Sequence, residues 1–353
     1  MLKKLSKQKI SDIITYGIVL VAFIVMQILI NAGQISSLFE GLMVPLCTYI
    51  ILAISLNLVV GVLGELSLGH AGFMCVGAFT SAFFSKCMQD MITNSIVRFL
   101  IALLIGIVVA AIFGLLIGIP VLRLNGDYLA IVTLAFGEII KNIVNVLFIG
   151  KDSKGFHFST KDVMALNMEP DGKVIVNGPQ GITGAPKDAT FFIGFILVLI
   201  TLFIVLNLIH SRDGRAIMAI RDNRIAAESI GINITKYKLM TFTISAAMAG
   251  AAGVLYGHNL SNLTANTNNF GYNMSINILV FVVLGGIGNI RGSIISAVVL
   301  TLLPELLRGL SDYRMLIYAI VLIVMMLFNW APKAIEWREK YLSFKKNKKE
   351  AVK

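Results

Sequence analysis

Charged residues are scarce in this chain of 353 residues, since Asp, Glu, Lys and Arg together make up only 14% of it. A soluble domain carries about 25% charged residues, which form its hydrated surface. The remaining composition agrees, because 57% of the residues are hydrophobic and the mean hydropathy is +0.85. Such a chain cannot cover a core with a polar surface, and it is too apolar to be intrinsically disordered. We therefore expect a polytopic α-helical membrane protein.

Residue types that build metal, disulfide and nucleotide sites are also few. The three cysteines form no C-x-x-C pair, and the four histidines lie far apart, so neither a disulfide framework nor a metal site is predicted. No Gly-x-x-x-x-Gly-Lys-Ser/Thr loop occurs, so we expect no ATP hydrolysis by this chain and no cofactor bound to it. The net charge of +11 is concentrated at the two ends and in one middle segment. That distribution does not indicate a nucleic-acid partner.

Long apolar runs take the place of the missing charges. A helix needs about 20 apolar residues to cross the hydrocarbon core of a bilayer. We expect a transmembrane domain over residues 12–332, between a tail at 1–11 and a basic tail at 333–353. The ten predicted spans are 12–33, 41–62, 66–86, 96–119, 128–149, 190–210, 238–257, 274–288, 292–308 and 314–331. The eighth and ninth could instead form one re-entrant pair, because glycines interrupt them.

The positions of Lys and Arg predict the orientation, because these residues favour short cytoplasmic loops. Both termini are rich in lysine, and the loop 211–237 is also rich in basic residues. All three are therefore expected in the cytoplasm, which an even number of spans allows. The loop 150–189 has balanced charges and is predicted to lie outside, with a hairpin turn at Asp171-Gly172.

Ionisable residues at membrane depth, in the predicted spans or in the breaks between them, are the first candidates for function. The chain has Glu65, Glu138, Lys141 and Glu305 at such positions. Glu138 and Lys141 stand three residues apart, so a local ion pair that faces the bundle explains them best. An ion-coupled carrier usually has more carboxylates or histidines at this depth. The scarcity therefore disfavours that class.

Two glycine-rich stretches interrupt the predicted helices, at Gly61–Phe73 and Gly285–Gly292. Glycine lowers helix propensity by about 1 kcal/mol, and a broken helix at membrane depth must line a cavity or be buried in protein. Paired interruptions in two halves indicate a translocation site, whereas close helix packing would use the same small residues. The alternatives stay open for the glycines alone, but polar residues in the first stretch favour a path. The candidate path residues are Gly64, Glu65, Ser67, Gly69 and His70.

The segment 211–231 is amphipathic at helical period, and it is too polar to span a membrane. A basic amphipathic helix between two spans lies on a lipid surface or docks into a groove of a partner. Its mixed charges favour a protein partner. The small residues in Ala226-Ala227-x-x-x-Gly231 would allow the backbone of that partner to approach closely.

Ala226-Ala227-x-x-x-Gly231 resembles the EAA-type coupling loop of ABC importer permeases, although Ile225 replaces its initial Glu. Several further pieces, spread over roughly residues 40–330, resemble the M-type subunit of the branched-chain amino-acid ABC permeases. They are Leu56-Asn57-Leu58 with Gly61 and Gly64, Leu66–Phe73, Leu122–Ile139, Gly178–Gly184, Ala219–Asn223 and Leu284–Gly288.

The resemblance implies one permease subunit of an ATP-driven importer for Leu, Ile and Val in the bacterial inner membrane. It also implies a second, H-type permease, two cytoplasmic ATPases that bind ATP and Mg²⁺, and an extracytoplasmic binding protein. The residues expected to contact an ATPase are Arg215, Arg221, Asp222, Ala226, Ala227, Glu228 and Gly231. Alternatives are a permease for urea or short amides, an ion-coupled carrier, and a membrane protein without a transport cycle.

Overall fold

The computed structural model describes residues 7–33, 36–122, 126–170, 172–310 and 313–330. Most of the predicted tail 1–11 and all of the predicted basic tail 333–353 lie outside the described residues.

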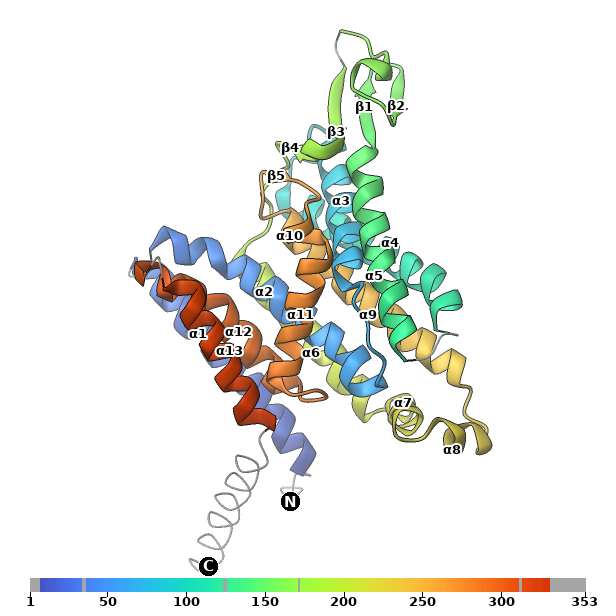
Figure 1. Cartoon of the computed structure of the whole chain (residues 1–353). Coiled ribbons are helices and arrows are strands. Elements are labelled where there is room, and N and C mark those ends of the chain that lie inside the picture. Colours follow the sequence, from blue (N-terminus) through green and yellow to red (C-terminus); the bar gives the residue numbers. More distant parts are fainter. Residues whose placement is uncertain (1–6, 34–35, 123–125, 171, 311–312, 331–353) are drawn as a thin grey trace, which may run out of the picture.

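A helix occupies each of the ten predicted apolar segments (Figure 1). Seven helical stretches of the described chain are long and apolar enough to cross a membrane. The shorter α3, α11 and α13 are not among them. The ten helices are α1 (Lys7–Asn31), α2 (Ser37–Asn57), α3 (His70–Cys87), α4 (Ser95–Val121), α5 (Asp127–Val146), α6 (Phe191–His210), α9 (Ile234–Gly257), α11 (Tyr272–Gly285), α12 (Ile290–Leu306) and α13 (Arg314–Trp330).

Helix α9 lies at the centre of the bundle, against α2, α3 and α4. Small residues permit this packing, since a Cβ added to Gly250 would lie 2.4 Å from the Ala110 Cβ. On another side of α9, a Cβ on Gly253 would lie 2.0 Å from the carbonyl oxygen of Met74. Transmembrane helices associate through such small residues because lipid supplies no hydrophobic driving force between them.

The predicted helical fold is confirmed, and the segment that follows α5 adds a small β sheet to it. Strands β1 (Phe148–Asp152), β2 (Gly155–Ser159) and β3 (Lys173–Asn177) form an antiparallel sheet in the order β2-β1-β3. Aromatic and β-branched residues favour strands here, and β4 (Ile182–Thr183) pairs with β5 (Asn262–Leu263) below the sheet.

A tight turn that the sequence analysis did not predict connects β1 to β2. Ser153 and Lys154 connect β1 to β2, and Asp152 Oδ1 accepts hydrogen bonds from the backbone N–H groups of Lys154 and Gly155. The Asp152 carboxylate stabilises this Asx-type turn, because it accepts hydrogen bonds from two backbone donors. Asp171, the first residue of the predicted turn, lies outside the described residues.

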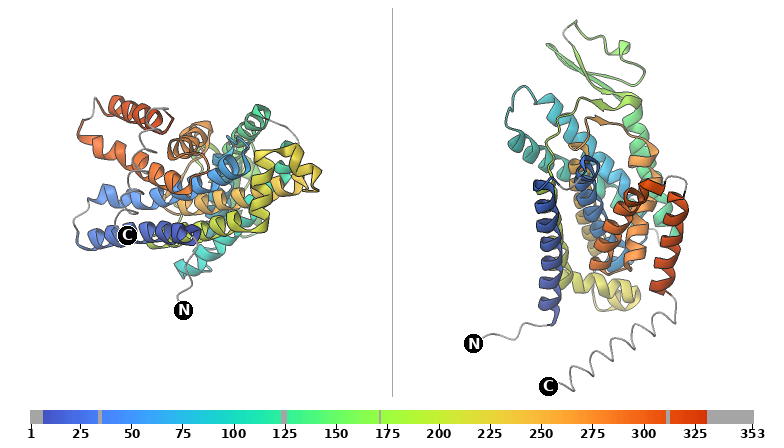
Figure 2. Two further views of the ribbon diagram at one scale, coloured as in Figure 1. Left: turned by 90° about the horizontal axis from the view of Figure 1, so that it is seen from below. Right: turned by 90° about the vertical axis from the view of Figure 1, so that its left-hand side faces the viewer.

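The sheet lies at one end of the bundle, and the short helices α7 (Arg212–Asp222) and α8 (Arg224–Ser229) lie at the other (Figures 1 and 2). The beginning of α1 and the end of α13 lie at the same end as α7 and α8. This arrangement has the two-sided form that the basic residues predict.

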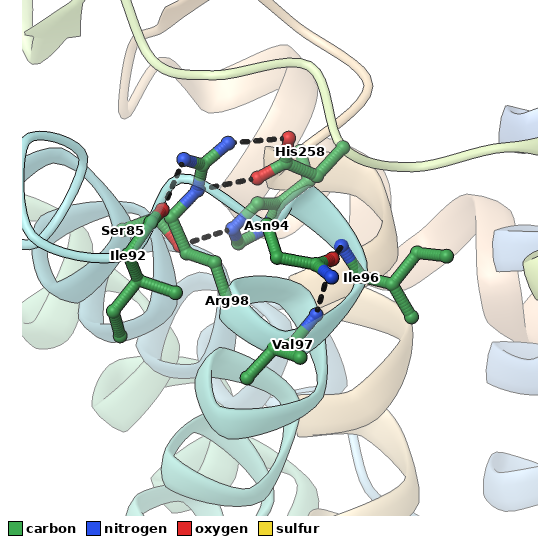
Figure 3. A network of polar contacts seen from close by, with 8 residues as sticks. Ser85, Ile92, Asn94, Ile96, Val97, Arg98 and His258 are labelled. Carbon is green, nitrogen blue, oxygen red and sulfur yellow. Dashed lines mark hydrogen bonds and ion pairs between the residues drawn. The ribbon is translucent and has the colours of Figure 1, made fainter.

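A buried polar network fastens the end of the bundle below the sheet (Figure 3). Arg98 donates two hydrogen bonds to Asp188, of 2.8 and 2.7 Å, and a third of 3.0 Å to the carbonyl of Ile92. Next to this pair, Ser85 Oγ lies 2.8 Å from His258 Nε2. The network joins α3, α4 and the end of α9 to the chain that leads into α6.

Candidate functional site

The two glycine-rich stretches meet near the end of the bundle that carries α7. Helix α2 continues into a π-helical turn, η1 (Leu58–Leu63), and the chain is non-helical from 64 to 69. The second break joins α11 to α12, with Gly286 and Gly288 at φ values of 93° and 81°. Such positive φ values favour glycine, because a Cβ would clash with the backbone.

Gly61 and Gly288 bring these two breaks into direct contact. A Cβ added to Gly61 would lie 2.3 Å from the backbone nitrogen of Gly288. Asn57 completes the contact, because its Oδ1 accepts a 2.8 Å hydrogen bond from Gly288 N–H and its Nδ2 donates one of 2.8 Å to Ser293 Oγ. The predicted interruptions are therefore confirmed as neighbouring breaks in the bundle.

Arg221 links the same place to α7. Its Nη1 donates a 2.9 Å hydrogen bond to the carbonyl oxygen of Gly61, in the π-helical turn. Its aliphatic chain lies on Gly64, where a Cβ would be 2.5 Å from the Arg221 Cγ. The guanidinium also holds Asp222 at 2.9 Å. π-helical turns are rare and are frequent at functional sites, and this one presents a backbone acceptor to a neighbouring helix.

Glu65 forms an ion pair with Lys238 of α9, in which the Lys238 side chain is only 3% exposed. The backbone N–H of Glu65 donates a 3.1 Å hydrogen bond to the Val59 carbonyl. A buried charge needs a partner, and loss of either member leaves the other uncompensated. The pair therefore fixes the start of the non-helical segment against α9.

The rest of the non-helical segment lies on α5. Leu68 N–H donates a 3.0 Å hydrogen bond to Thr133 Oγ1, and a Cβ on Gly69 would lie 2.2 Å from the Thr133 carbonyl oxygen. The Ser67 side chain is buried, and its hydroxyl has no hydrogen-bond partner. A buried hydroxyl without a partner is uncommon, because burial costs it its hydrogen bonds to water.

His70 is the first residue of α3, and it is buried in the bundle. Its Nε2 lies 2.7 Å from Ser55 Oγ. The Ser55 hydroxyl donates to the Leu52 carbonyl at 3.0 Å, so its oxygen is the acceptor for the Nε2–H of His70. The next N–H, of Ala71, donates to Ser275 Oγ at 3.2 Å. His70 thus joins α2 to α3 at the end of the break.

The predicted coupling segment is two short helices rather than one. Ser211 Oγ accepts the Gly214 N–H and begins α7, and Asn223 Oδ1 accepts the Ala226 N–H and begins α8. Asn223 has extended backbone, which ends α7. A side-chain cap satisfies a backbone donor that a helix start leaves free, so each capping residue begins a new helix.

The candidate coupling residues fall into two groups. Ala227 is 2% exposed and packs against Ile220 and Ile234, so it belongs to the core of the α7–α8 unit. Gly231 has a φ of 85° and no atom within 4 Å of an added Cβ. The other candidates lie on the exposed surface, together with two isoleucines that are 82% and 75% exposed. The candidates are Arg215, Arg221, Asp222, Ala226 and Glu228, and the isoleucines are Ile225 and Ile230.

Reasoning from the sequence missed four polar residues that hold the breaks in place: Asn57, Thr133, Lys238 and Ser275. Lys238 carried a signal, since it is a cation at the first position of a predicted span. The others are single polar residues in apolar runs, and a hydrogen bond between distant helices leaves no local pattern. No group of three or more His, Cys, Asp or Glu among the described residues is placed to hold a metal ion.

Comparisons with known proteins agree with this geometry. Residues 37–328 match the family described as branched-chain amino acid transport system, permease component. The chain belongs to this family. It is similar to the high-affinity branched-chain amino acid transport system permease protein LivM of Salmonella typhimurium, with 34% identity over 81% of this chain and 67% of that protein.

Two further relatives set the subunit type. LivM of Escherichia coli K12 is 35% identical over 81% of this chain and 67% of its own length. LivH of Salmonella typhimurium is 25% identical over 79% of this chain and 89% of its own length. The greater similarity to LivM confirms the predicted M-type family resemblance, for a multi-pass protein of the inner membrane. No solved structure matches the chain.

Proposed function

We propose that this chain is the M-type permease subunit of an ATP-driven importer for leucine, isoleucine and valine. The observation that carries the coupling to ATP is the contact between Arg221 of the exposed α7–α8 unit and the Gly61 carbonyl. It connects a surface suited to a partner with the place where the two broken helices meet. The names of the LivM and LivH relatives support the substrate class.

The chain crosses the membrane ten times in this proposal, with α7 and α8 in the cytoplasm and the β1–β3 sheet outside. Helices α3, α11 and α13 cross as well. Helix α3 begins directly after the break at 64–69, and α11 and α12 form an antiparallel hairpin around the break at 286–289. Short spans are expected where broken helices line a path. Labelling of single cysteines at Ser153 and Ser343 tests this, and reaction of both from the same side would contradict it.

The α7–α8 unit docks on a cytoplasmic ATPase through its exposed residues. Ile225 and Ile230 are large apolar side chains on a polar surface, which suits burial in a groove of a partner. Arg215, Arg224 and Glu228 are exposed on the same unit and supply charge complementarity. Binding and hydrolysis of ATP, with Mg²⁺, take place in that partner, so this chain is not itself an enzyme.

Movement of the docked unit reaches the broken helices through Arg221. Because its guanidinium holds the Gly61 carbonyl, displacement of α7 moves the π-helical turn and the Gly61–Gly288 contact with it. With glycines at both sides of this contact, the hydrogen bonds of Asn57 to Gly288 and Ser293 are what holds the two breaks together, and the breaks separate when these bonds open. This opens the segment 64–70 to the substrate, with Gly64 and Gly69 leaving room, Glu65 orienting the turn through Lys238 and Ser67 offering its hydroxyl.

Purified complex in proteoliposomes tests the function. The complex contains this chain, an H-type permease and two ATPases, with an amino-acid-binding protein added on the outside. We expect leucine uptake that needs ATP and does not respond to an ion gradient. Uptake driven by an ion gradient alone would make the chain a secondary carrier, and uptake of urea instead of leucine would change the substrate class. A complex that transports nothing would leave a structural role.

A further inference from the structure

The face that α5 and α11 share carries a charged pair at membrane depth. Glu138 stands ten residues after the first and eight before the last residue of the apolar stretch Tyr128–Val146. Its Oε1 accepts a 2.8 Å hydrogen bond from the first backbone N–H of α11, at Tyr272. Lys141 pairs with its other oxygen and donates at 3.2 Å to Thr267 of α10 (Thr267–Phe270). The pair therefore holds the start of α11 against α5.

This pair is not fully covered by the chain, since 24% of the Glu138 side chain is exposed. An ionisable group in the middle of a span faces protein or water, because hydrocarbon cannot solvate it. Asn142 of α5 and Asn277 of α11 are exposed on the same two helices. These polar side chains need polar surroundings at a depth where lipid offers none, while other exposed residues of α5, such as Ile139 and Ile143, are apolar.

The same face has apolar side chains beside the polar ones. A hollow of about 460 Å³ lies over α5, a volume in the range of small-molecule sites. The side chains that line it are Ile139, Asn142, Ile143, Val146, Leu147 and Thr160. Branched aliphatic groups therefore stand within a turn or two of an amide and a carboxylate.

Helix α4 shows what a lipid-facing surface of this chain is like. All its exposed residues from Leu100 to Pro120 are apolar, among them Leu104 and Val108 at 63% and 54% exposure. No ionisable side chain occurs in that stretch. The exposed residues of α4 therefore suit lipid, whereas Glu138 and Asn142 of α5 need polar surroundings.

We propose that the α5–α11 face, marked by Glu138, Asn142 and Asn277, is the wall that this chain contributes to the translocation path, opposite the second permease. This inference rests on the proposed function and specifies the site at which the solute passes. An amino acid with a branched aliphatic side chain matches the wall, because its charged end meets the polar residues while its side chain lies on Ile139 and Ile143. The non-helical segment 64–69 leads to the same helix, through Leu68 and Thr133.

Cysteine accessibility in the assembled complex tests the wall. Asn142→Cys and Asn277→Cys are made separately after Cys47, Cys75 and Cys87 have been replaced, and Val108→Cys is the matched control on α4. A water-soluble, membrane-impermeant thiol reagent is added during turnover, and the modified fraction is measured by mass spectrometry with and without leucine and binding protein. We expect reaction at both wall positions, several-fold slower modification when leucine is being transported, and no reaction at Val108→Cys.

Two results would overturn the inference. One is an absence of reaction at both wall positions in every nucleotide state. The other is modification at the same rate with and without leucine. Failure of the proposed function is a separate result, because it would show as a wild-type complex that lacks ATP-dependent leucine uptake. A complex with normal uptake and unprotected cysteines would refute the wall and leave the function intact.

Discussion

The two ends of the bundle are held together by contacts of different kinds. Below the β sheet, Arg98 and Asp188 join side chain to side chain through two hydrogen bonds, and the Arg98 side chain is 7% exposed. At the other end, Arg221 holds a single backbone carbonyl, and its side chain is 38% exposed. There Gly61 and Gly288 touch through their backbones, and the hydrogen bonds of Asn57 and the Glu65–Lys238 ion pair lie nearby.

The contact between Arg98 and Asp188 holds its end of the bundle firmly, whereas the contact between Arg221 and Gly61 can rearrange. Breaking a buried ion pair leaves an uncompensated charge, so the Arg98 end resists change. A contact made by one partly exposed guanidinium and two glycine backbones is weak, because water can replace it at small cost. The weak contact thus lies next to α7, although the buried Glu65–Lys238 pair also stands at that end of the bundle.

The largest effect is expected from breaking the fixed end. Arg98→Ala should destabilise the folded protein by about 3–5 kcal/mol, since Asp188 then stays buried without its partner. The measurement is thermal unfolding of purified protein in detergent, together with the yield from membranes. The double variant Arg98→Met with Asp188→Leu should lose much less stability, because it leaves no buried charge. Equal losses of stability in both variants would show that the unpaired charge of Asp188 is not the cause.

Overpacking the weak end should follow in size. Gly61→Ala places a Cβ against the backbone of Gly288, which we expect to cost about 1–3 kcal/mol and to reduce uptake. Gly41→Ala is the matched control in α2, because nothing lies within 4 Å of its added Cβ. Unfolding curves and uptake are compared for the two variants. Similar behaviour of both would contradict the close contact of the two breaks.

Arg221→Ala should separate ATP hydrolysis from transport. Loss of one hydrogen bond from a partly exposed charged group costs about 1.4 kcal/mol, and we expect the ratio of leucine transported to ATP hydrolysed to fall about tenfold. Assembly of the complex should be normal, because the bond lies within this chain. Arg215→Ala is the control for a surface arginine of α7. Loss of ATPase from the Arg221→Ala complex would instead make Arg221 a docking residue.

Ser67→Ala should affect uptake and leave stability unchanged. The hydroxyl has no partner in the structure, so its removal loses no internal hydrogen bond. If it binds the substrate during transport, the KM for uptake rises about three- to tenfold, which corresponds to one hydrogen bond of about 0.5–1.5 kcal/mol. Unchanged uptake kinetics would remove Ser67 from the path and leave close packing as the role of its segment.

The smallest effect concerns the sheet at the fixed end. Partial burial raises the pKa of Asp152, but hydrogen bonds from the N–H groups of Glu169, Lys154 and Gly155 and from His157 lower it overall. A depressed pKa in the folded state stabilises the sheet above the unfolded value of about 3.9, and this is lost as the pH falls below that value. Protease cleavage within 148–177 should therefore increase between pH 5 and pH 3.

Asp152→Asn is the control for this pH dependence. Its amide cannot titrate, so cleavage should be faster than in wild type at pH 5 and should change less on acidification. Glu169 also has a lowered pKa, through its contacts with Lys154 and Ser153, and it contributes with the same sign. A wild-type sheet whose cleavage does not change with pH would contradict the assigned role of Asp152.

Several features were predictable from the residues because each has a local physical cause. Apolar length predicts helices, so each of the ten segments contains one. Glycine clusters lower helix propensity, so the breaks at 64–69 and 286–289 fall where they were expected. The strands were not predicted, because β1 and β2 together span only about ten residues within a long polar loop. The predicted single coupling helix was wrong in detail, since the Asn223 cap starts a second helix.

The roles of polar residues were harder to predict. Arg221 is predicted to contact a partner, and the structure adds a bond from it to Gly61 within the chain, which the sequence did not indicate. Ala227 was expected to lie open to a partner, but it is buried against Ile220. Both residues lie on an amphipathic helix, where periodicity shows which residues share a face. It does not show whether that face meets another protein or the chain itself.

The sequence by itself determined the class of protein, the helical segments, the two glycine breaks and the family. Each of these depends on composition, on a local propensity or on a run of residues in order. Only the tertiary structure decided that the two breaks touch, that Arg221 reaches one of them, and that α5 and α4 present different surfaces. These facts join residues more than 200 positions apart, such as Asn57 and Gly288, which are separated by 231 positions. Contacts of that kind arise from packing of small residues and from pairing of buried polar groups, which depend on the final arrangement of helices and not on neighbours along the chain.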